Sequence, residues 1–220
     1  IQNVLNIPND KILAYINVKT LKDPEYVSGN NIVLITKRGI IKKTSLEAYS
    51  HPRTAGVNAV NLREGDELVE ALLTNGNEEI LIAAREGRCC RFDETDARPM
   101  GRNSTGVRGI NIDDDDEVIG AINYDPKAED ASAHTVLVVS EKGVKTINIT
   151  DKTGKLIAIK NVTENDDLMI IEKSGLTIRM AVSDIRVAGR ATQGVKLINI
   201  KNGDSIAAIS TVEKGGDEEQ

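Results

Sequence analysis

The chain has 220 residues, and its 28 Lys and Arg against 34 Asp and Glu give a formal net charge of −6. With 40% hydrophobic residues, this length is enough for one large β domain or two small domains with a true core. No run of about 18 apolar residues occurs, which excludes a membrane-spanning helix. Cys89 and Cys90 are the only cysteines, which excludes a disulfide framework or a zinc site and favours a cytoplasmic location.

The chain begins inside a repeating pattern. Residues 1–18 match the second half of the repeats that follow, and we expect a polar loop over residues 19–31. A five-residue aliphatic run, a charged pair and a glycine then recur four times, over residues 32–39, 80–87, 136–143 and 168–175. An aliphatic run that ends in a glycine turn is typical of the first strand of a hairpin.

Each hairpin continues in a similar order. A second strand with basic residues follows the glycine, and an irregular stretch then closes on Gly-Val. A third strand ends in Asn-Leu or Asn-Ile, and a fourth strand follows a polar turn. The Asn markers of the first two repeats, Asn61 and Asn111, are 50 residues apart, which is the length of a four-stranded propeller blade.

We therefore predict an all-β, propeller-like disc made of four-stranded repeats. The predicted blades cover residues 32–73, 80–123, 136–162 and 168–212, with residues 1–18 as the back half of one more blade. Residues 124–134 form a polar loop between blades, and residues 213–220 an acidic, disordered tail.

The third repeat is shorter than the others. In the first repeat the hairpin glycine and the glycine before Val are Gly39 and Gly56, 17 residues apart. In the third repeat Gly143 holds both positions, and Val144 follows it directly. Either this protein has lost a segment between residues 143 and 144, or the natural protein carries one that is missing from this sequence. We expect the second, because the loss would remove a second strand from an otherwise intact blade.

Positive charge is concentrated between each hairpin turn and the following Gly-Val. Residues 37–53, 85–108 and 173–196 together hold 16 basic and 6 acidic residues, against 12 basic and 28 acidic residues elsewhere. A basic stripe on an acidic body is typical of a surface that follows nucleic-acid phosphates. Only Tyr49 and Phe92 are aromatic in these segments, which favours backbone contacts with a duplex over base stacking. A curved rim would have to bend that duplex, at a cost of about 1–6 kcal/mol.

Three stretches resemble a known family. Residues 37–44, 96–109 and 189–195 are similar to the C-terminal domain of the A subunit of DNA gyrase. The resemblance implies a β-pinwheel, a disc whose blades exchange strands, with duplex DNA wrapped around its basic outer edge. The related domain of topoisomerase IV is an alternative. The family's box Gln-Arg-Arg-Gly-Gly-Lys-Gly is not in this chain, and residues 53–56, 102–106 and 190–194 carry degenerate versions of it.

The resemblance also implies the chain's role and partners. It implies a noncatalytic part of an ATP-dependent type II topoisomerase that introduces negative supercoils. The partners would be double-stranded DNA, the rest of the gyrase A subunit and the gyrase B subunit, in an A2B2 assembly without a membrane. ATP and Mg would act elsewhere in that assembly, so we expect no cofactor, metal or catalytic site here.

The expected DNA contacts are the basic residues of the stripe. They are Lys42, Lys43, Arg53, Arg88, Arg91, Arg98, Arg102, Arg179, Arg186 and Arg190, with Arg108 and Lys196 as further candidates. Two alternatives stay open: a propeller used as a protein-interaction disc whose rim meets an acidic partner, and an acidic tail that competes with DNA for the rim.

Overall fold

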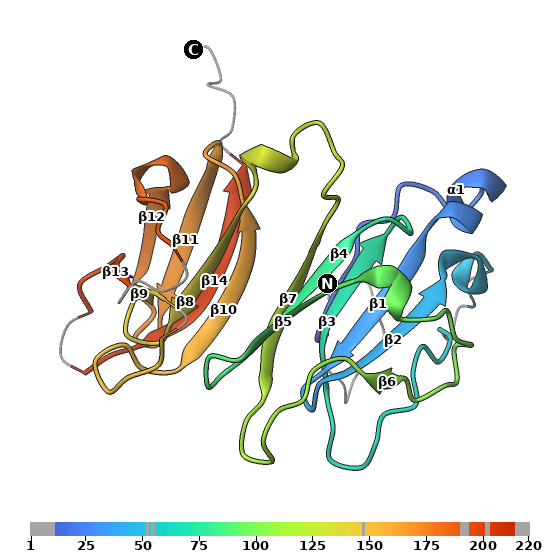
Figure 1. Ribbon diagram of the computed structural model, residues 1–220, viewed down its shortest axis with the longest axis horizontal. Coiled ribbons are helices and arrows are strands. Elements are labelled where there is room, and N and C mark those ends of the chain that lie inside the picture. The colour runs from blue at the N-terminus through green and yellow to red at the C-terminus, as the bar shows by residue number, and fades with distance from the viewer. Residues whose placement is uncertain are drawn as a thin grey trace.

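The structure is a computed structural model, and it describes residues 12–51, 53, 56–146, 148–189, 194–200 and 203–213. The described strands form four small antiparallel sheets that stand side by side in an arc (Figure 1), each built mainly from one repeat. Among the described residues the single α-helix, α1 (Pro24–Gly29), has six residues, so no described helix could cross a membrane.

The first blade shows how the repeats interlock. Its own strands are β1 (Asn31–Thr36), β2 (Ile40–Ser45) and β3 (Leu68–Thr74), and the sheet order is β3-β1-β2-β6. Strand β6 (Val107–Arg108) belongs to the second repeat, yet it pairs with β2 of the first. The third strand of a repeat therefore leaves its own blade and completes the preceding one.

The same exchange joins the last two repeats. The third blade contains β8 (Thr135–Ser140), β9 (Val144–Lys145) and β10 (Leu156–Val162), and β13 (Val195–Lys196) of the fourth repeat completes it. The other two sheets have three strands each. They are β4 (Glu79–Ala84), β5 (Cys89–Asp93) and β7 (Val118–Tyr124), and β11 (Asp166–Glu172), β12 (Thr177–Ala181) and β14 (Ile206–Glu213). The all-β, strand-exchanging disc expected from the sequence is confirmed.

Short helical turns connect these strands. The 3-10 turns cover Leu46–Tyr49, Glu94–Asp96, Ala131–Ala133 and Val182–Asp184. The polar loop expected over residues 19–31 contains α1 instead. Asp23 caps this helix, since its carboxylate accepts the backbone N–H groups of Glu25 (3.0 Å) and Tyr26 (3.4 Å), and Pro24 fits the first turn.

The core lies between successive blades rather than inside one of them. Ile35 and Ile41 of the first blade pack in one cluster with Ile82 of the second, and Leu137 of the third blade packs with Ile170 of the fourth. Because the first strand of each repeat buries side chains on both faces, its sequence is continuously aliphatic and does not alternate with polar residues.

Backbone hydrogen bonds fix the step from blade to blade. At the start of each fourth strand, one backbone N–H donates to a carbonyl of the preceding blade. The pairs are Val118 with Lys37 (2.8 Å), Leu156 with Arg85 (2.9 Å) and Ile206 with Glu141 (2.9 Å). Equivalent atoms make each of these bonds, so equivalent segments of successive repeats occupy equivalent places on the disc.

Candidate nucleic-acid interface

Strand exchange brings basic segments of two repeats together on the outer edge of the first blade. Residues 97–106, which precede β6 in the chain, run alongside β2. Pro99 lies opposite Lys43 there, and the Met100 N–H donates to the Lys43 carbonyl at 2.7 Å. Asn61 then ties this loop to the first repeat, because its side-chain amide donates to the Asn103 carbonyl at 2.6 Å.

We define the outer arginine group as Arg53 of the first repeat together with Arg98 and Arg102 of the loop that runs along β2. Arg53 and Arg98 are exposed and Arg102 is half-buried. No described residue forms an ion pair with any of the three. Their guanidinium groups are therefore available to bind anions, for which their planar fork of donors is well suited.

The fourth repeat places an equivalent segment on the third blade. Arg186 stands two residues after Asp184, as Arg98 stands two residues after Asp96, and it is exposed. Its carbonyl accepts a hydrogen bond from the Lys145 ammonium of β9, which holds this loop against the blade. Arg190, the counterpart of Arg102, lies outside the described residues.

The structure buries Lys42 and Lys43, which argues against the prediction that they contact DNA. Their exposed fractions are 1% and 4%, because the loop of the second repeat covers β2. The Lys42 ammonium donates to the Thr44 hydroxyl at 2.7 Å and the Ala59 carbonyl at 2.6 Å. Burial, and secondarily the nearby Arg102, lowers the pKa of Lys42 to about 8. In this arrangement both ammonium groups are hydrogen-bonded within the protein.

Lys43 instead belongs to a buried polar cluster between the first two blades. Its ammonium donates to the Glu94 carbonyl at 2.7 Å and lies 3.7 Å from the Glu94 carboxylate, which is fully buried. That carboxylate also accepts the Thr74 hydroxyl at 2.6 Å and the Glu78 N–H at 3.0 Å. The cluster connects the two blades.

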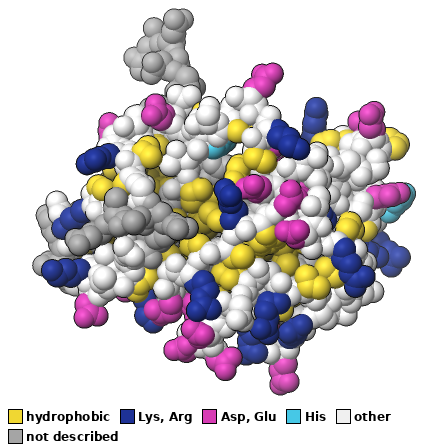
Figure 2. All heavy atoms as spheres, viewed as in Figure 1, with side chains coloured by type: hydrophobic (Ala, Val, Ile, Leu, Met, Phe, Trp, Pro, Cys, Tyr) yellow, Lys and Arg dark blue, Asp and Glu magenta, His cyan; other side chains and the backbone are white. Residues whose placement is uncertain are grey.

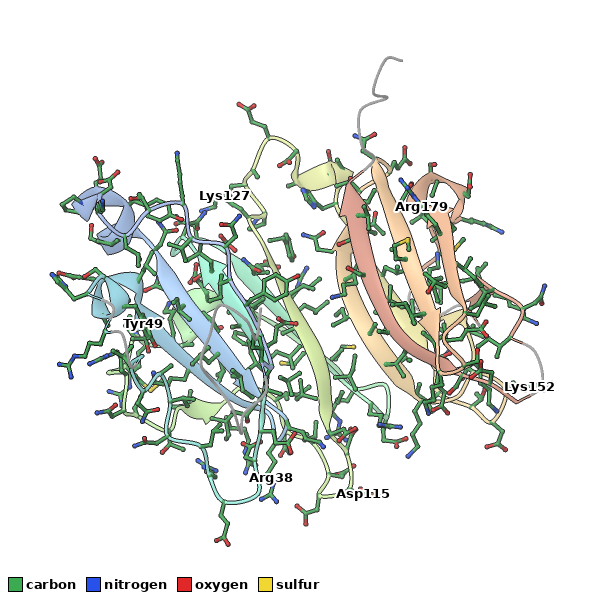
Figure 3. The ribbon with its side chains drawn as sticks, turned by 180° about the vertical axis from the view of Figure 1, so that it is seen from behind. Arg38, Tyr49, Asp115, Lys127, Lys152 and Arg179 are labelled. Carbon is green, nitrogen blue, oxygen red and sulfur yellow. The ribbon has the colours of Figure 1, made fainter. Side chains whose placement is uncertain are left out.

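The basic residue that recurs four positions after the hairpin glycine has an acidic partner in each complete repeat. Lys43 faces Glu94, the Arg91 guanidinium lies 3.3 Å from Glu79, and the Arg179 guanidinium lies 2.7 Å from Asp167. Recurrence at this position therefore reflects ion pairing within the protein. The Arg91 and Arg179 side chains remain mostly exposed, and Figure 3 shows Arg179 on β12.

Three further candidates lie outside the outer arginine group. Arg88 is exposed, but its guanidinium donates to the Asn111 carbonyl at 2.6 Å and lies 3.8 Å from Asp113. Arg108 and Lys196, on the exchange strands, are exposed. Arg108 also lines a cleft of about 340 Å³ with Arg38 and Arg63, which sequence reasoning did not single out. Asp113, Asp114 and Asp116 line the same cleft, so its charge is mixed.

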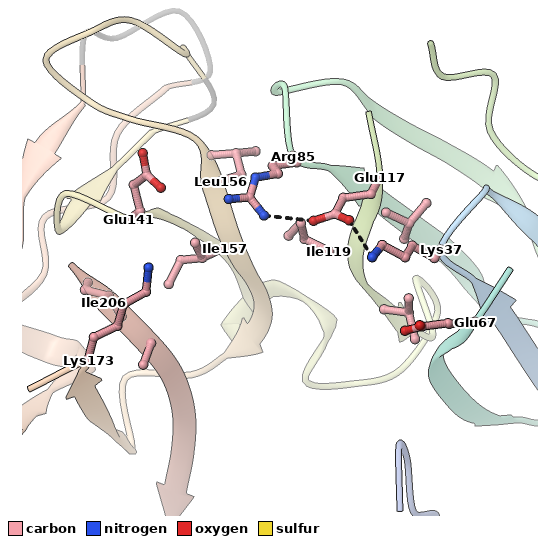
Figure 4. Close-up of a pocket in the computed structure, with 13 residues that line it drawn as sticks. Lys37, Glu67, Arg85, Glu117, Ile119, Glu141, Leu156, Ile157, Lys173 and Ile206 are labelled. Atoms are coloured by element: carbon pink, nitrogen blue, oxygen red, sulfur yellow. Dashed lines mark hydrogen bonds and ion pairs between the residues drawn. The ribbon is translucent and has the colours of Figure 1, made fainter. Parts of the chain in front are cut away.

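The inner ends of the blades surround a second cleft, of about 440 Å³ (Figure 4). Here the Glu117 carboxylate lies 2.9 Å from the Lys37 ammonium and 2.8 Å from the Arg85 guanidinium. The hydrogen bond to Glu117 raises the pKa of Lys37, and the same bond lowers the pKa of Glu117. Lys37 and Arg85 are thus paired within the protein, whereas Lys173, which also lines this cleft, has no ion pair with a described residue. Among the described residues no group of three or more His, Cys, Asp or Glu could hold a metal ion.

Comparisons with known proteins agree with this geometry. The family model described as the DNA gyrase C-terminal domain, a β-propeller, matches residues 30–75, 78–124, 132–163 and 166–213. The A subunit of DNA gyrase from Staphylococcus aureus (strain MRSA252) is 36% identical over 237 aligned residues, which cover 99% of this chain and 26% of the relative. The chain thus spans about a quarter of the length of the curated relatives it matches.

Two solved structures share the fold. The C-terminal domain of DNA topoisomerase IV superposes with a TM-score of 0.81 and 19% identity, covering 96% of this chain and 69% of that one. The DNA gyrase A C-terminal domain gives a TM-score of 0.76 and 19% identity, covering 96% of this chain and 73% of that one. With the family model matched in all four repeats, the chain belongs to the family of DNA gyrase C-terminal domains.

Proposed function

We propose that this chain binds duplex DNA along its outer edge, without base-sequence preference, and bends it. The observation that carries the proposal is the outer arginine group. Arg98 and Arg102 lie on the loop that runs along β2, Arg53 follows β2 in the first repeat, and none of the three has an ion pair with a described residue. Arg186 marks the equivalent edge of the third blade. Arginines on the first and third blades offer contacts to separate stretches of one duplex.

The physical basis is neutralisation of phosphate charge. Each arginine that contacts a phosphate releases condensed counterions, which makes the affinity fall steeply with salt. Bending a few tens of base pairs costs about 1–6 kcal/mol, and phosphate contacts on several blades offset that cost. The body of the disc is acidic, which disfavours DNA away from the edge.

Membership of this family supports a role for the chain within a larger enzyme. We infer that the chain is a noncatalytic domain of the A subunit of a DNA gyrase in the bacterial cytoplasm, acting with the other domains of that polypeptide and with a gyrase B subunit. By bending DNA it would set the crossing through which ATP-dependent strand passage introduces negative supercoils. The 36% identity to a gyrase sequence favours gyrase over topoisomerase IV, since the two solved structures, at 19% identity, support the fold alone.

A salt titration tests the proposal. Binding to an arbitrary duplex of about 40 base pairs should give log affinity against log salt a slope of about −0.9 per neutralised phosphate. In the double variant Arg98→Gln/Arg102→Gln, the slope should become shallower by about 0.9 for each phosphate that the variant no longer neutralises. The matched control is Lys127→Gln/Lys152→Gln, which removes the same charge from exposed positions outside the basic segments (Figure 3).

The control separates local contacts from net charge. If both double variants make the salt dependence shallower by the same amount, only net charge matters and the outer edge is not the binding surface. If neither the chain nor its variants bind duplex DNA at low salt, the interaction-disc alternative is favoured over DNA binding.

A further inference from the structure

A cleft opens where the hairpin turn of the first blade meets the chain between β6 and β7, and we call it the turn-end cleft. It has a volume of about 340 Å³, and three arginines line it, Arg38, Arg63 and Arg108. All three are exposed, and none forms an ion pair with a described residue. Figure 2 shows Lys and Arg side chains gathered at the lower edge of the molecule, and Figure 3 shows Arg38 at the same end.

The fold holds two of these arginines in place. Arg108 lies on β6, beside β2, and its guanidinium donates to the side-chain carbonyl of Asn111 at 3.0 Å. The Arg38 guanidinium lies over the turn of residues 63–66, since a Cβ at Gly65 would be 3.1 Å from it. Because strand pairing and the turn already position these groups, they lose less side-chain freedom when they bind a ligand.

Three aspartates line the same cleft, and two of them are engaged elsewhere. Asp113 lies 3.8 Å from the Arg88 guanidinium, and the Asp116 carboxylate accepts two backbone N–H groups at 2.8 Å and 3.1 Å. Asp114 is exposed and forms no ion pair with a described residue. The carboxylates that share the cleft therefore leave the three guanidinium charges unpaired, and repulsion among like charges favours a bound anion.

The turn-end cleft and the outer arginine group lie along the same strand. Arg108 is opposite Ile40, at the start of β2. Pro99, next to Arg98 in the chain, is opposite Lys43. From Ile40 to Lys43 a strand covers about 10 Å, and duplex DNA carries one phosphate charge per about 1.7 Å of its axis. One duplex that crosses this edge can therefore contact both groups of arginines.

The third blade carries basic residues at two of the three positions. Lys142 precedes its hairpin glycine as Arg38 does, and Lys196 follows the valine of its exchange strand as Arg108 does. Both lysines are exposed. In the second blade the position of Arg38 is occupied by Glu86. Basic residues at these positions thus occur on the same two blades as the arginines of the outer edge, which favours one continuous surface for phosphates.

We propose that the turn-end cleft holds a phosphate of the DNA duplex, through Arg38, Arg63 and Arg108, so that the bound DNA extends from the outer edge of the first blade onto the end that carries its hairpin turn. The inference rests on the proposed DNA binding and adds a second contact to it. The cleft volume of about 340 Å³ is near the lower end of the range for small-ligand sites, about 300–1,000 Å³, so a phosphate and its sugar enter while the base pairs stay outside. Asp114 opposes this contact, because its carboxylate repels phosphates.

Binding of an arbitrary duplex of about 40 base pairs across a salt series tests the inference. In the variant Arg38→Gln/Arg63→Gln, the slope of log affinity against log salt should become shallower by about 0.9, the value for one phosphate. The control Lys127→Gln/Lys152→Gln should change the slope less. Asp114→Asn should raise the affinity by about twofold to fivefold, as for other exposed charge pairs. Asp115→Asn removes the same charge one residue along the turn, from a side chain that does not line the cleft, and should raise it less (Figure 3).

The inference and the proposed function can fail separately. If the wild type binds the duplex and Arg98→Gln/Arg102→Gln makes the salt dependence shallower, but Arg38→Gln/Arg63→Gln has no more effect than the control, the turn-end cleft holds no phosphate and the inference is overturned. Equal affinities of Asp114→Asn and Asp115→Asn would contradict it as well. If the wild type does not bind the duplex at low salt, the proposed function is wrong and the inference fails with it. Thermal melting of each variant checks that it is folded.

Discussion

Glu94 offers a direct test of how the blades are held together. Its carboxylate is fully buried and accepts the Thr74 hydroxyl at 2.6 Å and the Glu78 N–H at 3.0 Å, while the Lys43 ammonium lies 3.7 Å away. Replacing Glu94 with Ala leaves a buried ammonium without its countercharge, and a hydroxyl and an amide without their acceptor. The first and second blades lose their shared polar cluster.

The size of the effect follows from these partners. Removing one member of a buried ion pair costs about 3–5 kcal/mol, so we expect Glu94→Ala to lower the free energy of unfolding by about 4 kcal/mol. Lys43→Met should cost less, about 2–3 kcal/mol, because the carboxylate keeps two neutral donors. The double variant Lys43→Met/Glu94→Ala should be less destabilised than the sum of the two single variants, by about 1–3 kcal/mol, since neither charge is then left alone.

Urea denaturation of the four proteins measures these values. With a denaturant slope of about 3 kcal/mol/M, Glu94→Ala should move the midpoint down by roughly 1.3 M. A shift that corresponds to less than about 1 kcal/mol, the range of an exposed ion pair, would refute the reasoning. Strictly additive single effects would show that Lys43 and Glu94 do not interact.

Three further predictions concern other parts of the fold. The pKa of Lys42 is about 8, against an ordinary value of 10.5. Between these two pH values the unfolded chain binds more protons than the folded one, so the free energy of unfolding should rise from pH 8 to pH 10.5 by as much as about 3 kcal/mol. Urea titrations at several pH values should show this rise in the wild type and not in Lys42→Met. Gly106 has a φ of +97°, and a Cβ there would lie 2.5 Å from the Ile41 carbonyl oxygen, so Gly106→Ala should lower the free energy of unfolding by about 3 kcal/mol. The control Gly76→Ala, at φ +92° with nothing within 4 Å of the added Cβ, should lower it by only about 1 kcal/mol. Equal losses would mean that close packing against β2 is unimportant. Glu117→Gln should cost less than about 1 kcal/mol because its ion pairs are partly exposed, and a larger loss in the same assay would reveal an unexpected role in joining the blades.

The sequence predicted the repeats well because each one carries its own turn signal. The glycines that close the hairpins, such as Gly39 and Gly87, have positive φ in the structure, and the aliphatic run before each becomes the first strand. The exchange topology did not follow from spacing. A third strand that pairs with the preceding blade has the same local sequence as one that pairs within its own blade. Only the family resemblance implied the exchange of strands.

The candidate site was predictable in part, because each repeat places its basic segment at the same position in the pattern. Counting charge located the basic segments, and Arg98 and Arg186 are exposed on equivalent loops. The burial of Lys42 and Lys43 could not be foreseen, because the chain that covers β2 comes from residues 97–106, a repeat away. Positive charge in a sequence does not reveal whether a long side chain turns toward solvent or toward a buried carboxylate such as that of Glu94.

If the outer edge bends the duplex that it binds, the two ends of that duplex come closer together, and the distance between them is the most direct measurement of bending. A duplex of about 40 base pairs, shorter than the persistence length of DNA, carries a donor dye at one end and an acceptor at the other. Saturating amounts of the wild-type protein should increase energy transfer between the ends, and the variant Arg53→Gln/Arg98→Gln/Arg102→Gln/Arg186→Gln should abolish the increase. Saturated binding with unchanged transfer, or an equal increase with the quadruple variant at saturation, would contradict bending by the outer edge.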